Sequence, residues 1–133
     1  MPVDSIRLTV PATSAAVRIT RAGAAGLATR AGFTYREVEQ LRLAVGEAAA
    51  LLAPEPAGEG TLAVDYDVAP DSLRIDLRLT GPAGDGHAVT TVPEVAAAVL
   101  DASVDEWHLL DGGRRLVLVK RVSELDDGDS DEY

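Results

Sequence analysis

The chain has 133 residues, of which 47% are hydrophobic and 26% are charged. This length supports one hydrophobic core and is too short for two. No apolar run approaches the roughly 18 residues of a membrane span, so we expect one domain and no membrane partner. The absence of cysteine excludes disulfides, thiol nucleophiles, zinc knuckles and iron–sulfur sites. A formal net charge of -10 repels a phosphate backbone, so nucleic acid is not an expected partner.

The acidity is concentrated at the C-terminus. The last ten residues contain six acids and no base, whereas residues 1–123 carry 16 acids and 12 bases. A like-charge segment with so few apolar residues cannot bury enough surface to offset its ordering entropy. We therefore predict a folded domain over residues 1–123 and a disordered acidic tail over residues 124–133. Solubilisation is the simplest role for this tail, with docking as the alternative.

The chain opens on an expected strand and helix. Residues 5–10 alternate apolar and polar side chains, the period of a half-buried strand. Thr13 or Ser14 can cap the following helix, which runs to Arg30, and Gly32 can take the left-handed conformation that ends it. The expected inner face of this helix comprises Val17, Thr20, Ala24, Leu27, Ala28 and Ala31.

A capping box marks the start of a second helix. In Thr34-Tyr35-Arg36-Glu37 the hydroxyl and the carboxylate can satisfy reciprocal backbone amides, and prolines and glycines over 54–60 close the helix. In the preceding helix, Gly23 and Gly26 lower helix propensity, so we expect them to allow close approach of a neighbouring element. The expected buried positions of the second helix are Val38, Leu41, Val45, Ala48 and Leu52.

Two strands follow, joined by a turn at 69–71. Leu62, Val64 and Tyr66 alternate in the first strand, and Leu73, Ile75, Leu77 and Leu79 share one face of the second. The resulting hairpin has one apolar and one polar side. Residues 81–87 contain three glycines and a proline, which predicts a turn-rich loop.

A third helix and a closing hairpin complete the domain. Thr91-Val92-Pro93-Glu94 reads as a second capping box, with the helix continuing to about Ala102. Strands at 107–110 and 116–119 then flank a turn at Gly112-Gly113. The order β-α-α-β-β-α-β-β predicts a two-layer α/β sandwich, with a mixed, mostly antiparallel sheet of about five strands and the helices on one face.

The octet Leu41-Arg42-Leu43-Ala44-Val45-Gly46-Glu47-Ala48 resembles the N-box helix of bacterial anti-sigma regulatory factors. These are the RsbW-like serine kinases of the GHKL (histidine-kinase-like) ATPase superfamily. The resemblance extends over about residues 5–122, through Pro11-Ala12-Thr13, Gly32-Phe33-Thr34, Val104-Asp105-Glu106-Trp107 and the final strand from Gly113 to Arg121. It implies the histidine-kinase-like ATPase fold. Arg outnumbers Lys eleven to one, a bias typical of GC-rich bacterial genomes.

The resemblance also assigns positions of an ATP site. Glu47 matches the glutamate that polarises the attacking serine hydroxyl. Leu51 stands where the family has the asparagine that holds Mg, and Leu79, just before Gly81, stands where an aspartate accepts the adenine amino group. Glu94 begins the helix whose amides would cradle phosphate. We therefore expect no resident cofactor, with ATP and Mg bound only if this degenerate site still functions.

These departures favour a protein-binding role over catalysis. The resemblance implies docking of a sigma factor or of a STAS-domain anti-anti-sigma factor. It also makes a homodimer plausible, because members of the family often pair. The alternatives are an active serine/threonine protein kinase using Glu47 as base, and a small-ligand sensor with a pocket beneath residues 81–86. With no basic or apolar export signal at residues 1–5, the expected location is the cytoplasm.

Other polar residues give weaker indications. Strand alternation places Asp65 and Asp67 on a solvated face, without the spacing of a calcium loop. His87 and His108 have no carboxylate or second imidazole at a ligand spacing, so no metal site is expected. The remaining interest lies in arginines of the two long helices, which can form bidentate bonds with acidic partners or serve simply as solubilising charges: Arg18, Arg21, Arg30, Arg36 and Arg42.

Overall fold

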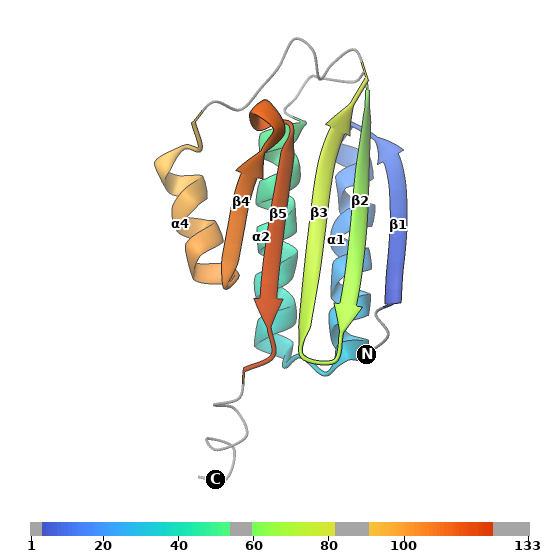
Figure 1. Cartoon of the computed structure of the whole chain (residues 1–133), viewed down its shortest axis with the longest axis vertical. Coiled ribbons are helices and arrows are strands. Elements are labelled where there is room, and N and C mark those ends of the chain that lie inside the picture. The colour runs from blue at the N-terminus through green and yellow to red at the C-terminus, as the bar shows by residue number, and fades with distance from the viewer. Residues whose placement is uncertain (1–3, 54–59, 82–90, 124–133) are drawn as a thin grey trace, which may run out of the picture.

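A computed structural model describes residues 4–53, 60–81 and 91–123 (Figure 1). Its elements in chain order are β1 (Asp4–Pro11), α1 (Ser14–Ala31), α2 (Tyr35–Leu52), β2 (Thr61–Ala69), β3 (Ser72–Thr80), α4 (Glu94–Ser103), β4 (Glu106–Leu110), the short 3-10 turn η1 (Asp111–Gly113) and β5 (Arg115–Arg121). The predicted element order is therefore confirmed. The predicted tail and the loop beyond Gly81, with His87, lie outside the described residues.

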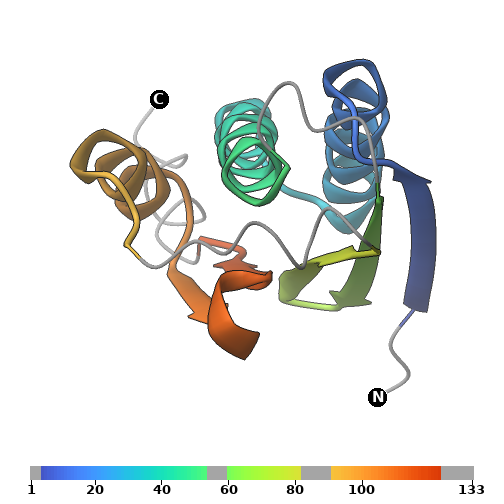
Figure 2. The ribbon, with the colours of Figure 1, turned by 90° about the horizontal axis from the view of Figure 1, so that it is seen from above.

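The five strands form one sheet in the order β1-β2-β3-β5-β4. Figure 2 shows α1, α2 and α4 in one layer over a single face of this sheet, which confirms the two-layer α/β sandwich. Each pair of neighbouring described strands is antiparallel, so the expected parallel component is absent from them. The reason is topological. Because β3 and β4 are each antiparallel to β5, they are parallel to each other, but β5 lies between them.

Local capping explains the ends of α1 and α2. The side chain of Thr13 accepts a hydrogen bond from the amide of Ala16, and Gly32 ends α1 with a φ of 94°. The capping box of α2 is confirmed in both directions. The amide of Thr34 donates to Glu37 Oε1 at 2.8 Å, and the amide of Glu37 donates to Thr34 Oγ1 at 3.1 Å.

The core lies between the helix layer and the sheet. All five expected inner residues of α2 are buried, as are the apolar residues of the β2–β3 hairpin. On α1 the inner face is rotated from the expectation. Ala16 is buried although it was not predicted, while Val17, Leu27 and Ala31 are half-buried and pack at its margin. At the edge strand β1, Ile6 is 44% exposed.

Gly23 allows α1 to pack closely against Tyr66 of the sheet. A Cβ at this position would lie 3.0 Å from Tyr66 Oη, and this hydroxyl donates a 2.8 Å hydrogen bond to the carbonyl of Thr20. Burial raises the pKa of Tyr66, because the phenolate would lose its hydration. The prediction for Gly23 is confirmed. The same prediction for Gly26 is wrong, because no atom lies within 4 Å of a Cβ there.

The start of α4 corrects one sequence prediction. Its N-cap is Pro93, and no side chain makes a capping hydrogen bond there. Thr91 lies two residues before the N-cap and Glu94 is the first helical residue, so neither has the spacing that a capping box requires. The closing hairpin is confirmed, with Gly112 and Gly113 at positive φ in the turn. No helix in the described part of the chain is long and apolar enough to cross a membrane.

Candidate functional site

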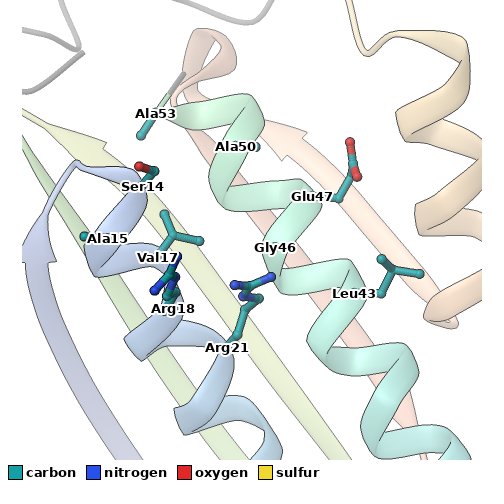
Figure 3. Close-up of a pocket in the computed structure, with 10 residues that line it drawn as sticks. All are labelled: Ser14, Ala15, Val17, Arg18, Arg21, Leu43, Gly46, Glu47, Ala50 and Ala53. Carbon is teal, nitrogen blue, oxygen red and sulfur yellow. The ribbon is translucent and has the colours of Figure 1, made fainter. Parts of the chain in front are cut away.

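A groove of about 590 Å³ runs between the N-terminal half of α1 and the C-terminal half of α2. Figure 3 shows its walls: arginines on α1, small residues on α2, and Glu47 on the rim toward α4. We call it the α1–α2 groove, and its lining residues are Ser14, Ala15, Val17, Arg18, Arg21, Leu43, Gly46, Glu47, Ala50 and Ala53.

The absence of a side chain at Gly46 determines the position of Arg21. A Cβ on Gly46 would lie 3.1 Å from Cδ of Arg21, so the stem of the arginine lies directly across the glycine. Arg18, one turn earlier on α1, lies on the same wall and is exposed. Within the described residues neither guanidinium forms an ion pair. The groove therefore presents two arginines with unused donors beside an apolar floor.

Of the positions that the resemblance assigns to ATP binding, Glu47 and Leu51 lie in the C-terminal half of α2, and Leu79 and Gly81 lie at the end of β3. Glu47 is half-buried on the groove rim. One turn later, Leu51 packs against the hydrophobic core, and Leu79 is a core residue with 4% exposure. Gly81 follows β3 with a φ of 98°, and a Cβ there would lie 3.0 Å from the Cα of Gly60.

The positions that the resemblance assigns to Mg and to adenine carry apolar side chains. A hard cation requires oxygen ligands, and Leu51 supplies none. The side chain of Leu79 has no acceptor for an adenine amino group. Its backbone amide donates a hydrogen bond to the carbonyl of Arg114. The described residues also contain no group of three or more histidine or acidic side chains able to hold a metal ion. His108 is exposed and lies 3.4 Å from Glu106 Oε1.

The opposite face of the molecule carries a ladder of ion pairs. Arg7 contacts Asp65 at 2.6 Å, and this hydrogen bond is the main cause that lowers the pKa of Asp65. Arg115 forms a bidentate pair with Asp76, which is only 5% exposed, and the pair raises the pKa of Arg115. The hydroxyl of Ser5 donates a hydrogen bond to Asp67 Oδ1. The expected polar face is confirmed, and its acids are held by arginines and a hydroxyl across the strands.

Sequence reasoning singled out the arginines and Glu47 but missed the groove that unites them. Four of its ten lining residues are alanine or glycine, which give no chemical signal in a sequence. Gly46 could have indicated it, because a glycine in the middle of an otherwise strong helix favours close approach of another group.

Comparison with solved structures identifies the class of fold. The chain superimposes with a TM-score of 0.64 and 17% identity on the crystal structure of the RsbU and RsbW domains of a Mycobacterium tuberculosis protein. The match covers 91% of this chain and 32% of that one, so the chain spans about a third of that protein. With the layer order and antiparallel sheet described above, this likeness confirms the histidine-kinase-like ATPase fold.

Sequence comparison then identifies the family. The serine-protein kinase RsbW of Listeria monocytogenes serovar 1/2a is 33% identical over 124 residues, which is 91% of this chain and 76% of the relative. RsbW of Halalkalibacterium halodurans is 28% identical over 122 residues, which is 91% of this chain and 73% of the relative. No family model matches the chain. At this identity and coverage, the chain belongs to the RsbW family of serine-protein kinases.

Proposed function

We propose that the chain is a protein-binding regulator of the anti-sigma type, acting in the cytoplasm with nucleotide binding weak or lost. Its partner is a sigma factor or a STAS-domain anti-anti-sigma factor, and the chain can also pair with a second copy of itself. The observation that carries this proposal is the apolar packing of Leu51 and Leu79, at the positions where the family has its Mg and adenine ligands. The scaffold is kept while these polar groups are replaced, which favours docking over phosphoryl transfer.

The α1–α2 groove supplies the docking surface. Arg18 and Arg21 offer planar donor sets that match carboxylates, and within the described residues no acid occupies them. Leu43, 55% exposed on the groove wall, supplies apolar contact area next to this charge. A partner with an acidic and partly apolar segment fits such a surface.

An affinity pull-down from a cytoplasmic extract of the source organism, read by mass spectrometry, tests the docking function. We expect a sigma factor or a STAS-domain protein to be enriched without added nucleotide, and the enrichment to be lost with Arg18→Glu/Arg21→Glu. Arg30→Glu is the matched control, because it removes an exposed arginine from the same helix outside the groove. Absence of both classes of partner, or enrichment that requires ATP, contradicts the proposal.

Calorimetric titration with Mg-ATP tests the nucleotide site separately. We expect no binding heat or a dissociation constant well above the micromolar range, because neither leucine can replace an oxygen ligand. A micromolar dissociation constant would overturn this part of the proposal.

The competing function is an active serine kinase, favoured by the family name and by the accessible carboxylate of Glu47 on the groove rim. Such an enzyme must transfer labelled phosphate from ATP to a co-expressed partner, and Glu47→Gln should abolish the transfer. If the docking proposal is correct, neither the unmodified protein nor Glu47→Gln transfers phosphate to the partner. Partner capture without nucleotide, together with absent phosphorylation, distinguishes the two functions.

A further inference from the structure

Positive charge is concentrated on the helix pair α1–α2 of an otherwise acidic protein. Between Thr13 and Ala53 the chain has five arginines, three glutamates and no aspartate, although its overall net charge is -10. The α1–α2 pair is therefore a cationic surface on an anionic molecule, and the α1–α2 groove lies in its middle.

Within the described residues, most arginines on the open face of the sheet are paired with acids, whereas most arginines of the helix layer are not. On the open face of the sheet, Arg7, Arg74 and Arg115 each contact an aspartate. On the helix layer, Arg42 lies 3.8 Å from Glu39. Four further arginines of the helix layer form no ion pair with any residue in the described ranges: Arg18, Arg21, Arg30 and Arg36. An acidic segment can form the most charge-assisted hydrogen bonds on a surface whose guanidinium groups have unused donors.

We propose that residues 124–133, the acidic tail of the same chain, fold back onto the α1–α2 groove and occupy its arginines. The segment Glu-Leu-Asp-Asp-Gly-Asp-Ser-Asp-Glu-Tyr provides six carboxylates and no base. Leu125 and Tyr133 add apolar side chains that match the apolar floor of the groove. The tail is thus an internal competitor for a surface that also fits an acidic partner.

The end of the described chain lies within reach of the groove. The amide of Ser123 donates to Glu37 Oε2 at 3.3 Å, which places the start of the tail at the first turn of α2. Nine residues separate Glu37 from Gly46, which is about 14 Å along the helix axis, and α1 lies a further 8–10 Å or so across. Ten extended residues span up to about 33 Å, so the tail can reach Arg21 without strain.

Tethering makes such a contact effective although each exposed ion pair is weak. A segment linked by a few residues meets its site at an effective concentration in the millimolar range. Glu47 lines the groove and repels acids, but its carboxylate points toward α4, away from the arginines of α1 (Figure 3). The contact is therefore expected on the α1 wall and to weaken with salt, because exposed charges are screened.

The chain's composition allows a zero-length cross-linking test. Its single lysine, Lys120, is 8% exposed and donates to the carbonyl of Ser103. Arg21→Lys therefore introduces an accessible amine into the groove while keeping the charge, and Arg30→Lys does the same outside the groove. A carbodiimide joins a carboxylate to an amine as an amide with loss of water to the reagent, and mass spectrometry of the digested monomer band locates the link.

We expect the monomer of Arg21→Lys to carry links to residues 124–133 at several-fold higher yield than Arg30→Lys. These links should disappear at about 1 M NaCl, where the Debye length is about 3 Å. Equal yields from the two variants, links confined to dimers, or no links at low salt would each overturn the proposal. The contact needs no partner protein, so its failure here would leave the proposed docking function untouched, and a failed pull-down would leave the tail contact untouched.

Discussion

Two glycines three residues apart on α1 should respond oppositely to the same substitution. At Gly26 a Cβ meets nothing within 4 Å, so Gly26→Ala gains helix propensity without a steric cost. At Gly23 the Cβ would lie 3.0 Å from Tyr66 Oη and 3.3 Å from Cζ of the same ring. Tyr66 is 1% exposed and cannot move outward, so the added methyl group must displace a buried ring or the helix.

The magnitudes follow from these contacts. Gly26→Ala should stabilise the protein by about 0.5–1 kcal/mol. Gly23→Ala has the same gain, but overpacking costs about 1–3 kcal/mol and weakening the hydrogen bond from Tyr66 to the carbonyl of Thr20 costs about 1 kcal/mol more. The net effect of Gly23→Ala is a loss of about 1–3.5 kcal/mol, and the two variants should differ by about 2–4 kcal/mol.

Urea unfolding followed by far-ultraviolet circular dichroism measures both variants, and an unchanged m-value keeps the comparison two-state. The background Tyr66→Phe provides the control, because it removes the atom nearest to the added methyl group. In that background the cost of Gly23→Ala should fall by about 1 kcal/mol. If Gly23→Ala is as stabilising as Gly26→Ala, the close approach of α1 to β2 at this point is refuted.

Two further perturbations test capping and surface charge. Thr34→Ala should destabilise the protein by about 1 kcal/mol. Thr91→Ala should change stability by less than about 0.5 kcal/mol, since α4 has no side-chain cap. Urea unfolding of the two variants measures the difference. The hydrogen bond from Arg7 lowers the pKa of Asp65, so its stabilisation is complete above about pH 4, the unfolded value, and is lost as pH falls through the lower folded value. Arg7→Met should flatten the acid limb of stability in pH-dependent unfolding, and an unchanged limb would contradict the pairing.

The sequence predicted those features that depend on neighbouring residues. The capping box from Thr34 to Glu37 and the left-handed Gly32 are local chemistry, and both are present in the structure. At Thr91 the same four-residue pattern failed, because Pro93 displaced the start of the helix. Local motifs are therefore reliable where no competing residue offers another helix start.

Features that depend on distant residues were beyond the sequence. Strand alternation does not reveal that Asp76 is only 5% exposed, because it is covered by Arg115, which lies 39 residues later in the chain. The register of β3 against β5 brings these two residues together, and this register cannot be read from a single sequence. The α1–α2 groove escaped for the same reason, since Arg21 and Gly46 become neighbours only when the two helices pack.

The two faces of the molecule use charge in opposite ways. In the β2–β3 register Asp65 stands directly opposite Asp76, an arrangement that repels unless cations flank it. Arg7 on one side and Arg115 on the other supply them, so the charges of the sheet face neutralise one another within the fold. Among the described residues, the arginines of α1 form no ion pair with an acid. Their positive potential therefore extends into the solvent around the groove. An acidic partner and the acidic tail would both be attracted to the helix layer, where they compete, and not to the sheet face.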